Sequence, residues 1–201
     1  MSGRSVDTIG VVLFERFELL DVFGPVEILG HLKNALRIVM VGPAAGLVAS
    51  AQGQAVVAES GRDDCPPLDG LLVPGGIGTR TEVDDASLLA WLRERAKAAS
   101  LVMSVCTGAA LLARAGVLDG RRATSNKRAF DWVVEQGPAV EWVRRARWVH
   151  DGHFWTSSGI SAGIDMTLAL VAERFGRDFA EQVSRRLEYT WHRDAADDPF
   201  V

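Results

Sequence analysis

A cysteine stands where a buried apolar stretch gives way to small residues: residues 101–105 are followed by Cys106-Thr107-Gly108. This pattern predicts a strand that runs into a helix, with Cys106 at the turn. The first N–H groups of a helix favour negative charge, so we expect the thiol to ionise more easily than in water. The arrangement is typical of a nucleophile elbow, with cysteine in place of serine. A small apolar core residue is the alternative, since free cysteine is often buried.

Asp21 is the second residue whose surroundings suggest chemistry. Its neighbours Leu19, Leu20, Val22 and Phe23 are all apolar. Burying a carboxylate among such side chains is costly unless it finds a partner. The carboxyl could therefore serve as an acid or base beside a nucleophile. A helix cap that accepts backbone N–H groups is the alternative interpretation.

Two glycines close another apolar stretch, in which Leu-Leu-Val-Pro precedes Gly75 and Gly76. Adjacent glycines at the carboxyl end of a strand let the backbone approach a ligand and turn N–H groups toward it. This predicts an oxyanion or anion site, although tight turns use the same residues. No Gly-x-Gly-x-x-Gly opens a helix after the first predicted strand, and the sequence has no Gly-Lys-Ser/Thr, so a nucleotide loop is not indicated.

The remaining cysteine and the histidines do not form a strong metal-binding pattern. His150 and His153 flank Asp151-Gly152, which predicts a β-hairpin. Two histidines on a hairpin can bind a metal, but no third ligand lies near them, and we predict neither a metal nor another cofactor. Cys65 lies in a predicted loop and is interpreted as incidental. Two distant cysteines suit a reducing compartment without disulfides.

Strands and helices alternate along most of the chain, which predicts a mostly parallel sheet covered on both faces. Predicted strands lie at residues 8–14, 36–41, 46–58 (one or two strands), 68–73, 101–105 and 146–156 (the hairpin). Predicted helices lie at residues 17–32 with a start, break or kink at Gly24-Pro25, then at 84–99, 127–136, from about 165 through 175, and 178–189. Because ligands bind beyond the carboxyl ends of parallel strands, Cys106 and the Gly75-Gly76 pair are expected to meet at one crevice.

The 201 residues are 48% hydrophobic and carry a net charge of −4. This is enough for one α/β domain over residues 1–201. Nucleic acid and membrane surfaces are disfavoured as partners because no polybasic segment occurs. The densest basic run, Arg144, Arg145 and Arg147, is interpreted as a solvated face. No signal-peptide core or bilayer-length apolar stretch is found, so a cytoplasmic location is predicted.

Several short motifs, taken in order, resemble the ThiJ/PfpI superfamily, whose members are class I glutamine amidotransferase-like. They are Leu20-Asp21 with Gly24-Pro25, Pro66-Pro67-Leu68-Asp69, Pro74-Gly75-Gly76, Ser104-Val105-Cys106-Thr107-Gly108, Arg122-Ala123-Thr124, Ile160-Ser161-Ala162-Gly163-Ile164-Asp165 and Leu187-Glu188-Tyr189. The resemblance covers nearly the whole chain. Within the superfamily the chain looks most like isocyanide hydratases and the similar sensor domains of certain AraC-type regulators.

This resemblance implies a flavodoxin-like three-layer sandwich with a mostly parallel sheet and a small β-hairpin, and it implies a homodimer. It also implies site roles. Cys106 would be the nucleophile, Asp21 the carboxylate that faces it and Thr107 the residue after the nucleophile. Gly75 and Gly76 would form the oxyanion loop.

The chain lacks the active-site motifs of several other activities in the superfamily, which reduces the number of activities to consider. PfpI-type peptidases are expected to have histidine directly after the cysteine, and glutamine amidotransferases a later His-x-Glu pair. This chain has Thr107 at the first position and no His-x-Glu, which disfavours both activities. Asn126 stands where many relatives place a histidine, so a Cys–His dyad and the glyoxalase or deglycase activity that would depend on it are weakened.

We therefore predict a lyase that hydrates a small-molecule electrophile, an isocyanide. The Cys106 thiolate would attack the terminal carbon, and a protonated Asp21 would supply a proton; water would then resolve the thioimidate to an N-substituted formamide. Apolar neighbours would keep Asp21 protonated. The alternatives are glyoxal or methylglyoxal hydration by the same cysteine, and a ligand- or redox-sensing module. A transcription factor is disfavoured, since the chain leaves no room for a helix-turn-helix domain after its final helix.

Overall fold

A seven-stranded sheet forms the middle layer of the protein, as shown by a computed structural model that describes residues 7–32 and 35–201. In spatial order the strands are β10 (Trp148–Asp151), β11 (Phe154–Ser157), β7 (Leu101–Val105), β6 (Gly70–Val73), β1 (Asp7–Val12), β2 (Leu36–Gly42) and β5 (Ser60–Gly61). Neighbouring strands run parallel except β10 and β11. Every residue of β6 and β7 is buried, which is typical of central strands covered on both faces.

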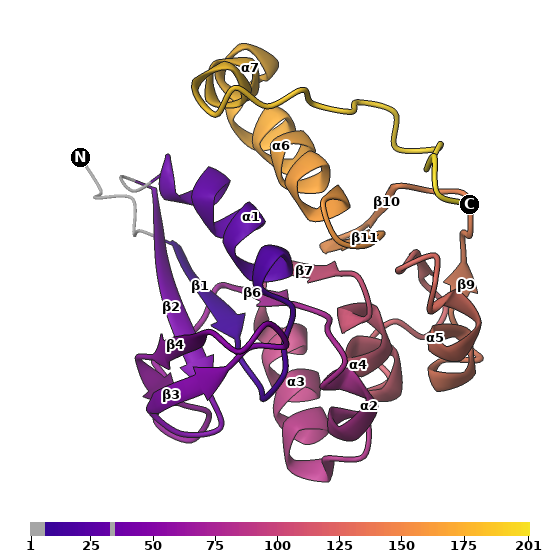
Figure 1. Ribbon diagram of the computed structural model, residues 1–201. Helices are drawn as coiled ribbons and strands as arrows, with labels where there is room; N and C mark the ends of the chain where they lie inside the picture. The colour runs from indigo at the N-terminus through magenta and orange to yellow at the C-terminus, as the bar shows by residue number, and fades with distance from the viewer. Residues whose placement is uncertain (1–6, 33–34) are drawn as a thin grey trace.

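Helices cover both faces of this sheet (Figure 1). One layer holds α1 (Leu19–Gly30), α6 (Ala162–Phe175) and α7 (Arg177–Arg186), in which α6 packs against both of the others. The opposite layer holds α2 (Thr79–Glu82), α3 (Ala86–Ala98), α4 (Gly108–Arg114) and α5 (Phe130–Gln136). The predicted flavodoxin-like sandwich with a mostly parallel sheet is confirmed.

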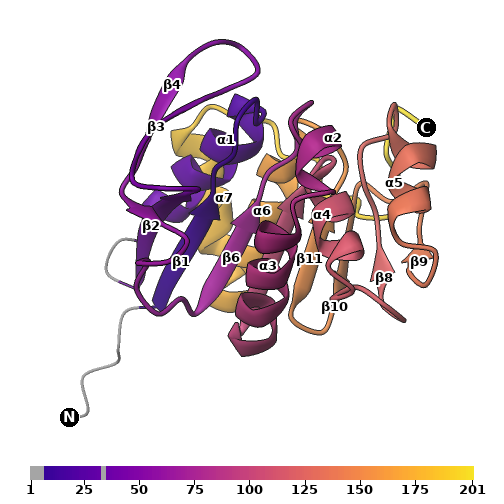
Figure 2. The same cartoon turned by 90° about the horizontal axis from the view of Figure 1, so that it is seen from below.

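The predicted hairpin is present, and residues 46–58, predicted as one or two strands, form a second one. The antiparallel pair β10–β11 turns at Gly152, whose φ of 65° suits glycine. A second pair, β3 (Gly46–Ala49) and β4 (Ala55–Ala58), projects from one side of the sheet, while the parallel pair β8 (Arg122–Ala123) and β9 (Glu141–Trp142) lies beside α5 on the other side (Figure 2).

The structure differs from the predictions in several places, among them the unpredicted two-residue strands β5, β8 and β9. Pro25 lies inside α1 without ending it, and its missing N–H leaves the carbonyl of Asp21 without the usual helical donor. The four-residue helix α2 was not predicted, since so short an element has no periodicity to detect. Arg147, predicted to be solvated, is only 5% exposed and pairs with Asp165 at 2.6 Å.

Candidate active site

Cys106 lies at the carboxyl end of β7, where the chain turns into α4. Its φ of 57° is in the left-handed region that non-glycine residues rarely adopt. Backbone contacts hold this turn: the Cys106 N–H donates to the carbonyls of Ser157 and Ser158 at 3.2 Å. The Ser125 hydroxyl donates to the Cys106 carbonyl at 2.7 Å. Cys106 is only 6% exposed, so its thiol is almost fully shielded from solvent.

Asp21 reaches the same site from the first turn of α1 and is fully buried. Its Oδ2 accepts the Gly75 N–H at 2.8 Å, and Oδ1 has no hydrogen-bond partner among the residues that the structure describes. The bond comes from a residue far along the chain, so Asp21 is not a helix cap as the alternative interpretation held.

The environment of Asp21 favours its protonated form. Burial raises the pKa of this carboxyl well above its ordinary value, and the negative charge of Glu18 adds to the shift. The Gly75 N–H and the nearby Cys106 thiol oppose it. This direction agrees with the prediction of a protonated Asp21.

The prediction of an easily ionised thiol is wrong for this state of the site. Burial raises the pKa of Cys106 well above its ordinary value, and an ionised Asp21 would raise it further. The N–H and hydroxyl of Thr107 and the side chain of Asn126 stabilise the thiolate, but these donors do not outweigh the loss of water. Two buried acids therefore face each other: an ionised Asp21 opposes ionisation of Cys106, while the Cys106 thiol stabilises the Asp21 carboxylate by a hydrogen bond.

Thr107 ties the nucleophile turn to the glycine loop. Its Oγ1 accepts the Gly76 N–H at 3.1 Å and the Thr79 hydroxyl at 3.1 Å. A Cβ on Gly75 would lie 2.5 Å from the Thr107 nitrogen, so only glycine allows this approach. The structure thus brings Gly75 and Gly76 to the site, but Asp21 and Thr107 already accept their N–H groups. Both glycine amides position side chains of the site and are not vacant oxyanion donors.

Asn126 closes the opposite side of the thiol. Its Oδ1 accepts the Ala129 N–H at 3.1 Å, and its side chain hydrogen-bonds the Cys106 sulfur. A Cβ on Gly159 would lie 2.1 Å from the Asn126 Nδ2 and 3.0 Å from the Cys106 Sγ. A glycine is therefore required where this loop passes the thiol. Sequence reasoning marked Asn126 only as a missing histidine, and it missed Gly159, Thr79 and Ser125 because nothing local distinguishes them.

The other candidate ligands and thiols lie apart from this site. His150 stacks on Trp155 with ring centroids 4.0 Å apart, and its Nδ1 lies 3.3 Å from Glu173. Over the described ranges no group of three or more histidine, cysteine, aspartate or glutamate residues could hold a metal ion. Cys65 is half-buried, and its sulfur contacts the Arg62 carbonyl at 3.6 Å.

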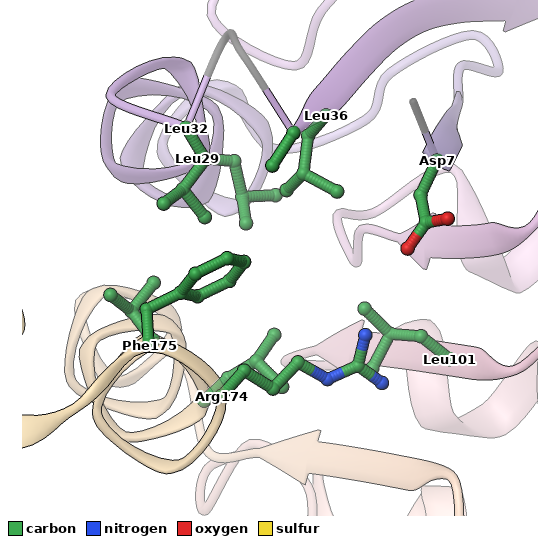
Figure 3. A pocket seen from close by; sticks show the side chains of 10 residues that line it. Asp7, Leu29, Leu32, Leu36, Leu101, Arg174 and Phe175 are labelled. Carbon is green, nitrogen blue, oxygen red and sulfur yellow. The ribbon is translucent and has the colours of Figure 1, made fainter. Parts of the chain in front are cut away.

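A cavity of about 510 Å³ opens at the other end of the sheet (Figure 3). Leu29, Leu32 and Phe175 line one part of it, with Arg174 and Asp7 at its polar edge. It also contacts Leu101, the first residue of β7, whereas Cys106 follows the last one. The cavity therefore does not serve the cysteine.

Comparison with known proteins identifies the family. Residues 7–173 match the DJ-1/PfpI family model. The chain belongs to the DJ-1/PfpI family. It is 36% identical over 181 residues to isonitrile hydratase of Pseudomonas putida, a match that covers 90% of this chain and 78% of that protein. A THiJ/PfpI family protein from Pseudomonas syringae, 31% identical, superposes with a TM-score of 0.85 over 97% of this chain and 78% of that one.

Regulators also occur among the relatives of this DJ-1/PfpI chain. The HTH-type transcriptional regulator GbdR of Pseudomonas aeruginosa is 28% identical over 201 residues, covering 97% of this chain and 54% of the regulator. The chain thus spans about half the length of that relative. No helix in the described parts of the chain is both long and apolar enough to cross a membrane.

Proposed function

We propose that this DJ-1/PfpI protein is a cysteine-dependent lyase that hydrates an isocyanide to an N-substituted formamide. The observation that carries the proposal is the pairing of a buried thiol, Cys106, with a buried carboxyl, Asp21, that has an unpartnered oxygen within the described structure. Asn126, not a histidine, contacts the thiol from the other side. The similarity to a protein named isonitrile hydratase supports the same activity.

The steric surroundings of the thiol also support this substrate. Gly159 passes so close that even a methyl group there would contact the sulfur, and the thiol residue is almost fully buried. A bulky carbonyl centre would need more space. The terminal carbon of an isocyanide is unsubstituted and lies at the end of a linear group, so it suits a narrow approach.

The first step follows from the two neutral acids. The Cys106 sulfur forms a bond to the terminal carbon, the Asp21 proton goes to that carbon, and the thiol proton replaces it on the carboxyl. The product is a neutral thioimidate, R–N=CH–S–Cys106, and no charge is left in a site that disfavours charge.

Water completes the reaction. It adds its hydroxyl group to the C=N carbon and a proton to the nitrogen, with Asp21 relaying the proton. The C–S bond then breaks, the hydroxyl proton returns to the sulfur, and the N-substituted formamide leaves. Cys106 and Asp21 end in the protonation states in which they began.

Turnover of a simple alkyl isocyanide by wild type and Cys106→Ala tests the proposal. We expect formamide production by the wild type and a loss of at least about 10³-fold in the variant, because the nucleophile is removed. Cys65→Ala is the matched control and should keep its activity. Methylglyoxal is assayed in parallel. Preference for it would establish the 2-oxoaldehyde activity instead, and inactivity toward both substrates would support a sensing module.

We also propose that the chain forms a homodimer. Leu20 and Phe23, within two residues of Asp21 on α1, are 42% and 40% exposed. Such apolar side chains favour a protein contact. Sedimentation equilibrium would show a dimer, and Leu20→Glu with Phe23→Glu should shift it toward monomer. A monomeric wild type would contradict this part of the proposal.

A further inference from the structure

Arg80 is a half-buried cation without an acidic partner. It is the second residue of α2, and its guanidinium carbon lies 3.2 Å from the centroid of the Trp132 ring. Within the described ranges it forms no ion pair, and its Nη1 is buried without a hydrogen-bond partner. Arg62 and Arg147, which are also shielded from solvent, have carboxylates at 3.1 and 2.6 Å. A guanidinium with unused donors is suited to an anion.

The position of Arg80 connects it to the Cys106 site. The preceding residue, Thr79, donates its hydroxyl to Thr107 at 3.1 Å. Burial lowers the pKa of Arg80, and the negative charge of an ionised Cys106 would oppose this shift. Trp132 comes from α5, shortly after Asn126 in the chain. The Arg80–Trp132 contact therefore links α2, whose Thr79 bonds Thr107, to α5, which follows Asn126 in the chain.

The stacking fixes the orientation of the guanidinium plane. An indole face stabilises a cation above it and restricts the rotation of the arginine side chain. The N–H donors lie on the edge of the guanidinium, and among them those of Nη1 have no partner in the described structure. A carboxylate matches this edge with two parallel hydrogen bonds, whereas a neutral ester or amide gains no charge-assisted bond.

We propose that Arg80 is a specificity-determining residue that binds a carboxylate on the substrate, so that the natural electrophile is an isocyanide bearing an acid group. The inference rests on the proposed function for its choice of electrophile. The anion site itself rests on three observations: the hydrogen bond from the preceding Thr79 to Thr107, the unpartnered Nη1 of Arg80 in the described structure, and the stacking of Arg80 against Trp132.

The first test compares isocyanoacetate with its methyl ester in wild type, Arg80→Gln, Arg80→Lys and Arg37→Gln. Arg37 is an exposed residue of β2 at the opposite end of the sheet, so its variant removes the same charge elsewhere. We expect the wild type to prefer the anion in kcat/KM, and Arg80→Gln to lose this preference by about 10- to 100-fold with little change for the ester. Arg80→Lys should retain part of it, and Arg37→Gln all of it.

The second test does not need hydratase activity. Alkylation of Cys106 by iodoacetate and by iodoacetamide is followed by mass spectrometry, with Cys65 as the internal reference. Iodoacetate should be favoured at Cys106 relative to Cys65 in the wild type and lose this advantage in Arg80→Gln. If Arg80→Gln loses the iodoacetate preference but neither isocyanide is turned over by the wild type, the anion site is supported and the hydratase function is contradicted. An iodoacetate ratio that is the same at both cysteines, or unchanged in Arg80→Gln, would overturn the proposal.

Discussion

Two carboxyl groups are fully buried near α6 and α1, and their surroundings differ. Asp165 accepts bonds from the Arg147 Nε at 2.7 Å, the Tyr189 hydroxyl at 3.0 Å and the His192 N–H at 2.9 Å. The Asp21 carboxyl accepts one backbone N–H, from Gly75, and its only other hydrogen-bonding contact in the described structure is with the Cys106 thiol. Both are 0% exposed. The difference indicates that Asp165 holds the structure together, and it supports the proposed acid–base role of Asp21.

The comparison predicts its largest effect in turnover. Asp21→Asn keeps the shape of the side chain and can still accept the Gly75 N–H, but it cannot transfer a proton. We expect isocyanide hydration to fall by about 10²- to 10⁴-fold, the range for loss of an acid–base group, without loss of the fold. Steady-state kinetics measures the hydration rate, and circular dichroism measures whether the fold is retained. Full activity in Asp21→Asn would contradict the proton-transfer role.

The same substitution at the other carboxyl, Asp165→Asn, should lower the stability of the protein. Asp165→Asn leaves the Arg147 charge buried beside a neutral amide, and breaking such a pair costs about 3–5 kcal/mol. Asp198, 3.8 Å from the same guanidinium, offsets part of this cost. Chemical denaturation should show a lower free energy of unfolding, with turnover per folded molecule nearly unchanged. A stability equal to wild type would mean that the Asp165 network is not structural.

A third prediction concerns Asn126, which contacts the Cys106 sulfur. Removing its amide with Asn126→Ala takes away a hydrogen bond that stabilises negative charge on Cys106, so the thiol pKa should rise further. We expect a roughly tenfold loss of kcat, equal to the contribution of about one hydrogen bond. The pH dependence of Cys106 alkylation measures the pKa. An unshifted profile would assign Asn126 to packing alone.

The smallest expected effect is the contribution of Asp21 to the pH dependence of folding stability. The pKa of Asp21 is raised in the folded state, so the wild type loses stability as pH rises above the ordinary pKa of an aspartate. The Asp21→Asn variant has no ionisable side chain at this position, so it should be more stable than the wild type at pH 7 to 8. Each kcal/mol of additional stability should raise its Tm by about 2–4 °C. The difference should vanish near pH 4. Equal Tm values across this range would show that Asp21 is not strained by its burial.

Local sequence signals predicted the parts of the site that depend on a short pattern. The apolar strand before Cys106 and the small residues after it determine the turn, and the apolar neighbours of Asp21 correctly predict a raised pKa. Parallel topology then explains why Gly75 lies beside Cys106, since β6 and β7 are neighbours.

The remaining features depend on contacts that no local pattern reveals. Arg147 is buried because Asp165, Asp198 and the tail residues enclose it, although the nearby Arg144 and Arg145 are exposed. The amides of Gly75 and Gly76 are occupied by side chains from α1 and from the end of β7. The thiol pKa was predicted in the wrong direction, because the helix terminus is visible in the sequence while the depth of burial is not.

The left-handed backbone at Cys106 has a consequence for the evolution of this site. A side chain at that φ is disfavoured by about 1–2 kcal/mol, and glycine escapes this penalty. Selection for thermal endurance alone would therefore drive position 106 toward glycine, while selection for catalysis would restore cysteine. A natural population that keeps cysteine at this turn is one in which the chemistry is still under selection.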